Sequence, residues 1–92
     1  MLENVNKIYA KAKEQNVDLS IAWAMVRNED RLAGVTDHTD LDKAWKVVNG
    51  YQSTISKMIV AGDEEALKNL LENIEAGNNA EVVKIIESWN LK

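Results

Sequence analysis

The chain has 92 residues, of which 46% are hydrophobic and 28% charged, and its formal net charge is −4. This length and balance predict one globular domain over residues 1–92 and exclude a disordered polymer. Because the sequence has no cysteine, it excludes disulfide scaffolds, thiolate zinc sites and cysteine nucleophiles.

Two amphipathic helices are predicted in the first third of the chain. The first begins near Leu2 and ends near Asn16, a residue type that accepts the left-handed conformation common after helix ends. Asp18 or Ser20 can cap the second, which continues to Leu32, and its alanines and methionine favour helix over strand. Residues 21–26 are apolar on every side, which predicts a segment packed between neighbouring elements.

A long central helix is predicted over residues 41–61, after a loop over residues 34–39. Thr39 or Asp40 stands where an N-cap belongs, and Gly62 stands where a left-handed C-terminal residue belongs. We expect Trp45 to be largely buried, because it lies on the apolar stripe of this helix. The stripe consists of Leu41, Ala44, Trp45, Val48, Tyr51, Ile55, Met58 and Ile59.

Asn49–Gly50 offers a competing interpretation, because this dipeptide favours the type I′ turn of a β-hairpin. A hairpin would also require alternation with period two, and the flanking residues do not give a clean apolar face. The helical stripe keeps its phase through Gly50, so helix is the better prediction. Gly50 can then mark a bend, a break into two helices, a close helix crossing or simply a tolerated residue.

Two shorter helices are predicted at the C-terminal end, over residues 63–75 and 80–89. Gly62 and Gly77 can end the preceding helices, and Asp63 can cap the next one. The fold class is therefore a small all-α bundle of four to five helices with a long central helix.

His38 is the only histidine, and it lies among Asp37, Asp40 and Asp42. The spacing does not match a calcium-binding loop, and zinc would require further histidine or cysteine ligands. No nucleophile–base pair or glycine-rich phosphate loop is recognisable. We therefore expect a non-enzymatic protein with no catalytic, cofactor-binding or metal-ligating residues.

The negative charge is concentrated after Gly62, where seven acidic residues face three basic ones. The last predicted helix also has more apolar residues than one narrow stripe needs, and Trp89 stands close to the chain end. An apolar patch ringed by glutamates would suit a basic protein partner or a second copy. The predicted partner-binding residues are Val83, Ile85, Trp89, Glu72, Glu75, Glu81 and Glu87.

The leading functional prediction is a protein-interaction module that acts by stoichiometric contact, as a regulator, an inhibitor or an assembly chaperone. The alternative is a nucleic-acid-binding regulator that uses Arg27, Arg31, Lys43 and Lys46. The N-terminal segment lacks the apolar core of a signal peptide, and no apolar run is long enough to span a bilayer. We therefore expect a cytoplasmic protein that binds neither membranes nor, in the leading interpretation, nucleic acid.

Overall fold

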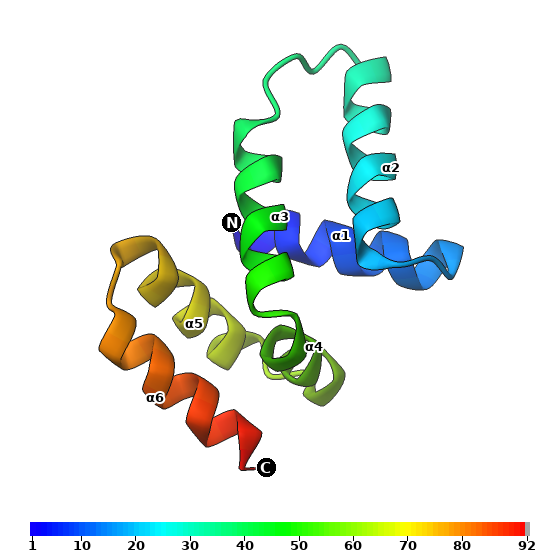
Figure 1. The fold of residues 1–92 in the computed structure, drawn as a ribbon. Coiled ribbons are helices and arrows are strands. Elements are labelled where there is room, and N and C mark those ends of the chain that lie inside the picture. The colour runs from blue at the N-terminus through cyan, green and yellow to red at the C-terminus, as the bar shows by residue number, and fades with distance from the viewer. Residues whose placement is uncertain (92) are drawn as a thin grey trace. The chain divides into compact units, whose positions relative to one another are not determined.

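The computed structural model describes residues 1–91, which form six α-helices and no strand (Figure 1). The all-α prediction is therefore confirmed, and the helix count is higher by one than the largest number predicted. Within residues 1–91, no helix combines the length and apolarity needed to cross a bilayer. The helices are α1 (Leu2–Gln15), α2 (Leu19–Leu32), α3 (Thr39–Gly50), α4 (Gln52–Ala61), α5 (Glu64–Ala76) and α6 (Asn79–Asn90).

The predicted central helix is two helices, so the prediction of one long helix was wrong. The helical backbone ends at Gly50, and Tyr51 adopts φ −126° and ψ 29°. Glycine is the poorest helix former after proline, so the break falls where continuation is least favoured. The apolar stripe did not reveal the break because its phase survives it, and Val48 before and Ile55 after are both fully buried.

Left-handed residues end three of the helices, as the sequence predicted. Asn16, Gly62 and Gly77 have φ values of 53°, 71° and 74°. After Gly62, the amide of Asp63 donates to the carbonyl of Met58 at 3.1 Å, which satisfies a carbonyl that the ending helix leaves open. These turns fix where α1, α4 and α5 stop.

The helix starts are capped partly as predicted. Asp63 accepts a hydrogen bond from the amide of Ala66 at 3.0 Å, which confirms it as the cap of α5. Thr39 and Asp40 do not cap α3, because the helix already includes both. Instead, the carboxylate of Asp37 accepts hydrogen bonds from the amide of Thr39 at 3.0 Å and from its hydroxyl at 2.6 Å.

The chain divides into two compact units, Met1–Val48 and the residues from Asn49 onward. In the N-terminal unit α1 packs closely against α2, and Lys11 Nζ donates to Glu29 Oε1 between them at 2.6 Å. In the C-terminal unit α4, α5 and α6 all pack against one another. That residues 1–92 form a single domain stays a prediction.

Each unit has its own buried apolar residues. The expectation that residues 21–26 pack between neighbours was wrong, because Ile21 is 49% exposed and only Ala22 and Val26 of the segment are buried. Helix α2 has an open side that the apolar run did not reveal. The fully buried or nearly buried side chains of the N-terminal unit are Val5, Ile8, Ala22, Val26, Leu41, Ala44, Val47 and Val48. Those of the C-terminal unit include Ile55, Met58, Leu67, Leu70, Leu71, Val82 and Trp89.

Two glycines should respond in opposite ways to substitution by alanine. A Cβ at Gly50 would meet no atom within 4 Å, and its backbone has no positive φ, so Gly50→Ala should stabilise the protein by about 0.5–1 kcal/mol. Gly62 has equally open space but a φ of 71°, so Gly62→Ala should destabilise by about 1–2 kcal/mol. Urea unfolding midpoints measure both, and a shift of both variants in the same direction would contradict this account.

Candidate functional site

The predicted acidic surface lies on α5 and α6. Glu72 and Glu75 stand one turn apart on α5, and Glu81 and Glu87 stand on α6; all four side chains are exposed. The sequence from residue 49 carries seven acidic and four basic residues, a formal net charge of −3. This part of the chain therefore presents a predominantly negative field to a partner.

The apolar residues of α6 divide between a buried and an exposed face. Val82 and Trp89 are 4% and 9% exposed, and Ile85 and Ile86 between them are half-buried. Trp89 is therefore not a surface anchor, because it lies seven residues from Val82 on the face that α6 packs against its neighbours. Val83 is 51% exposed and forms the exposed apolar part of the predicted surface.

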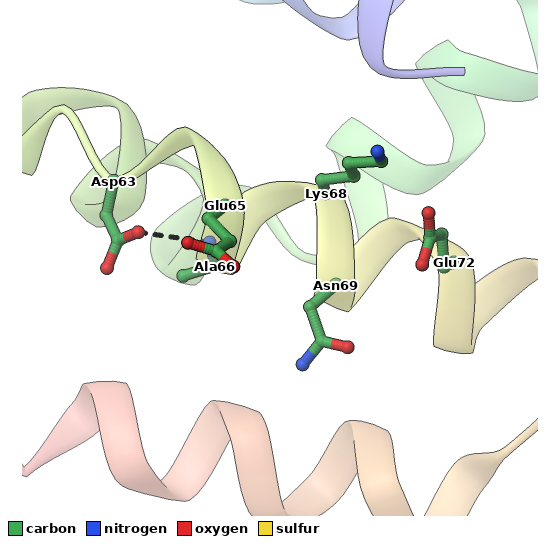
Figure 2. A pocket seen from close by; sticks show the side chains of 6 residues that line it. All are labelled: Asp63, Glu65, Ala66, Lys68, Asn69 and Glu72. Carbon is green, nitrogen blue, oxygen red and sulfur yellow. Dashed lines mark hydrogen bonds between the residues drawn. The ribbon is translucent and has the colours of Figure 1, made fainter.

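A shallow hollow of about 540 Å³ runs along α5 (Figure 2). Lys68 and Asn69 extend from α5 in different directions, and Asp63 is occupied in capping the helix. Because all the lining comes from one helix and its cap, the hollow encloses no ligand on its own. It does extend the polar surface next to Glu72. The lining residues are Asp63, Glu65, Ala66, Lys68, Asn69 and Glu72.

A second candidate surface lies in the N-terminal unit, where α2 and α3 run side by side (Figure 1). Trp23 of α2 and Trp45 of α3 stack with their ring centroids 5.3 Å apart and their planes within 6° of parallel. That separation corresponds to an offset stack, the arrangement that aromatic quadrupoles favour. Trp45 is half-buried: its ring stacks on Trp23, most of its surface is covered, and the remainder stays in solvent, so the expectation that it is largely buried holds without full burial.

The carboxylate of Asp42 connects the two helices beside this stack. Its Oδ1 accepts from the indole nitrogen of Trp23 at 3.1 Å and from Nε of Arg27 at 3.2 Å. The Asp42 and Arg27 side chains are 38% and 44% exposed, so their ion pair is partly screened by water. Its main effect is geometric, because one acceptor holds both the Trp23 ring and the Arg27 guanidinium in place.

These side chains line an open surface hollow of about 420 Å³, called the cavity below. Arg31 lies one turn beyond Arg27, and its Nη2 donates to Asn28 Oδ1 at 2.8 Å. The lining therefore combines an aromatic ring with two guanidinium groups. It consists of Trp23, Ala24, Arg27, Asn28, Arg31 and Asp42.

The alternative nucleic-acid patch is only partly assembled around this cavity. Arg27 and Arg31 line it. Lys43 and Lys46 do not; they are exposed on α3, where they directly follow Asp42 and Trp45 in the sequence. The sequence did not predict that Asp42 accepts hydrogen bonds from Trp23 and Arg27, or that the two tryptophans stack. The available signal was the spacing of Trp23 and Arg27 at i, i+4 on one helix and of Asp42 and Trp45 at i, i+3 on the other.

His38 lies directly before α3 and is half-buried, and its Nδ1 has no hydrogen-bond partner. Its backbone carbonyl accepts from the amide of Asp42 at 2.8 Å, in the position of an N-cap. The hydrogen bonds from Thr39 hold the pKa of Asp37 below its ordinary value. Within residues 1–91, no three histidine or acidic side chains gather in a way that could hold a metal ion.

None of the family models, curated proteins or solved structures compared with this chain matches it. The geometry of the two surfaces is therefore the basis for a functional proposal.

The tryptophan stack generates a spectroscopic prediction. Trp45→Ala should cost about 1–3 kcal/mol, below the about 3–5 kcal/mol typical of a fully buried tryptophan, because part of the ring remains in solvent. The exciton signal of the paired indoles in circular dichroism should disappear with it. Trp23→Phe should remove the same signal and Trp89→Phe should retain it. An unchanged signal in Trp45→Ala would show that the rings do not stack in solution.

The loop before α3 generates a second prediction. Zinc or calcium ions at about a tenfold molar excess should leave the melting temperature unchanged, because only an ion that binds the native state would raise it and no such site is expected. An upward shift that His38→Ala abolishes would establish a metal site at this loop.

Proposed function

We propose that this chain is a small, acidic, non-catalytic protein-interaction module of the cytoplasm. It acts by stoichiometric contact, as a regulator, an inhibitor or an assembly chaperone. No cofactor or metal takes part in this proposal.

The observation that carries the proposal is the exposure of Val83. It stands outside the buried face of α6, with half of its surface open to solvent, and Glu87 lies one turn away on the same side of the helix. An apolar side chain next to a carboxylate matches the pattern of an interface with an apolar centre and a polar rim. Half-buried Ile86, three residues after Val83, extends the apolar part of this face, whereas Ile85 points about 160° away from Val83 on the helix.

The chemistry of the surface defines its partner. Glutamates on α5 and α6 favour a partner with lysine or arginine around an apolar pocket, because complementary charges steer encounter and select register. A second copy of the chain is the other possibility, with Val83 at the centre of a symmetric contact. In that case the glutamates must lie at the rim, where water screens their mutual repulsion.

The nucleic-acid alternative has weaker support. Asp42 pairs with Arg27 inside the patch, and the sequence up to residue 48 carries seven basic against eight acidic residues, a net charge of −1. Binding to a phosphate backbone depends on several unpaired cations that release counterions. Arg31, Lys43 and Lys46 alone make a small patch for that purpose.

Sedimentation equilibrium tests the self-association branch. If the chain pairs with itself, the parent should dimerise below about 100 μM, and Val83→Asp should weaken that dimer at least about tenfold by placing a charge in an apolar contact. Ser20→Asp adds the same charge to an exposed position on α2 and should leave the dimer intact. A parent that stays monomeric throughout this range eliminates self-association.

Affinity capture from the source cell tests the branch with a different partner. The tagged parent and Ser20→Asp should retain a common protein that Val83→Asp loses. The proposal predicts that this protein, once purified, binds the parent with one-to-one stoichiometry and is basic at its contact surface. Retention of the same proteins by all three forms would place binding elsewhere on the chain.

A further inference from the structure

The cavity between α2 and α3 has the composition of a binding anchor. Tryptophan and arginine are the residues most enriched at energetically dominant positions of protein interfaces. Trp23 contributes an aromatic ring to the lining, and Arg27 and Arg31 contribute two guanidinium groups one turn apart. None of these residues belongs to the acidic surface on α5 and α6.

The hydrogen bonds within the cavity leave donor groups for a ligand. A guanidinium group has five N–H donors in a planar fork. Arg27 donates through Nε to Asp42, and Arg31 donates through Nη2 to Asn28. The remaining N–H groups of these exposed side chains are available to an incoming acceptor, and a carboxylate matches the fork in two parallel hydrogen bonds.

The charge of the lining also favours an anion. Two arginines and one aspartate give it a net charge of +1, in a chain whose net charge is −4. Because Asp42 is neutralised locally by Arg27, the excess positive charge lies at Arg31. Lys46, exposed on α3 one turn after Asp42, adds to the positive field beside the cavity.

We infer that this cavity binds an acidic peptide segment of a partner protein, in which an apolar side chain adjoins a carboxylate. The carboxylate pairs with the guanidinium of Arg31, and the apolar side chain packs against the indole of Trp23. The hydrogen bond from the Trp23 indole to Asp42 fixes the ring before binding, so little side-chain freedom is lost when the peptide arrives. The inference is independent of the proposed α5–α6 interface, because it concerns other residues and a partner of opposite charge.

A peptide fits these observations better than a nucleic acid. Because Asp42 pairs with Arg27, Arg31 is the unpaired cation of the lining, which suits the single carboxylate of a peptide better than the row of charges on a phosphate backbone. Of the two helices, only α2 contributes cations to the cavity itself. Sequence-independent binding to phosphate needs a longer row of cations.

A capped synthetic peptide of alternating glutamate and leucine residues is the probe for the full chain. Titration should shift the indole N–H resonance of Trp23 in a saturable manner, and Trp23→Phe assigns that resonance. A matched peptide with glutamine in place of glutamate should bind at least about tenfold more weakly, because it cannot form the charged pair. Arg31→Gln should weaken the glutamate peptide by a similar factor.

Two controls separate this site from general electrostatics and from the proposed α5–α6 interface. Lys46→Gln removes one positive charge outside the cavity lining and should weaken the peptide less than about threefold, as expected for an exposed, screened charge. Val83→Asp should bind the peptide as the parent does, so a failed α5–α6 proposal leaves this result unaffected.

Three outcomes would overturn the inference. One is the absence of a saturable shift of the Trp23 resonance up to about 1 mM peptide, which is the weak end of specific binding. Another is equal binding by the parent and Arg31→Gln, with unchanged melting temperature. The third is tighter binding of a thymidine oligonucleotide than of the peptide, with a steep dependence on salt, which would assign the cavity to nucleic acid.

Discussion

The contact between α2 and α3 depends on one carboxylate. Asp42 accepts hydrogen bonds from Trp23 and from Arg27 through the same oxygen, so a single side chain of α3 orients two side chains of α2. The indole of Trp45, one turn further along α3, then stacks on Trp23. The tryptophan side chains and the carboxylate of Asp42 connect α2 and α3, whereas the backbones of α1 and α2 come close to each other. Of the residues that line the hollow beside this contact, five belong to α2 and Asp42 belongs to α3.

The sequence predicted most helix boundaries because those boundaries are set locally. Asn16, Gly62 and Gly77 adopt the left-handed conformation that their residue types tolerate, and Asp63 caps α5 through a hydrogen bond to a residue three positions away. Such signals need no knowledge of the fold. The sequence also predicted in part which sides of α6 are exposed and buried, because Val82 and Val83 point about 100° apart on any helix.

The wrong predictions concerned a break in the backbone and the exposure of side chains, neither of which can be derived from the spacing of apolar residues. An apolar stripe that stays in phase across Tyr51 predicts one helix. In the structure, Tyr51 has a ψ of 29° and separates α3 from α4. The apolar run around Ile21 gave no information on how many neighbours its side chains would meet. The site between α2 and α3 was missed for a related reason. Its residues come from two helices, and only their register brings Asp42 opposite Trp23 and Arg27.

The two proposed surfaces differ in charge, and that difference bears on how one small chain can select its partners. The glutamates of α5 and α6 repel an acidic segment and attract a basic one, whereas the cavity at Arg31 does the reverse. Under the two proposals, each surface discriminates against the partner of the other, because their charges are opposite in sign. Specificity of this kind comes as much from the repulsion of the wrong partner as from attraction of the right one. In the cavity, Asp42 bears on both sides of the proposed selectivity: its bond to Trp23 orients the aromatic ring, and its pairing with Arg27 removes one cation that a phosphate backbone would need.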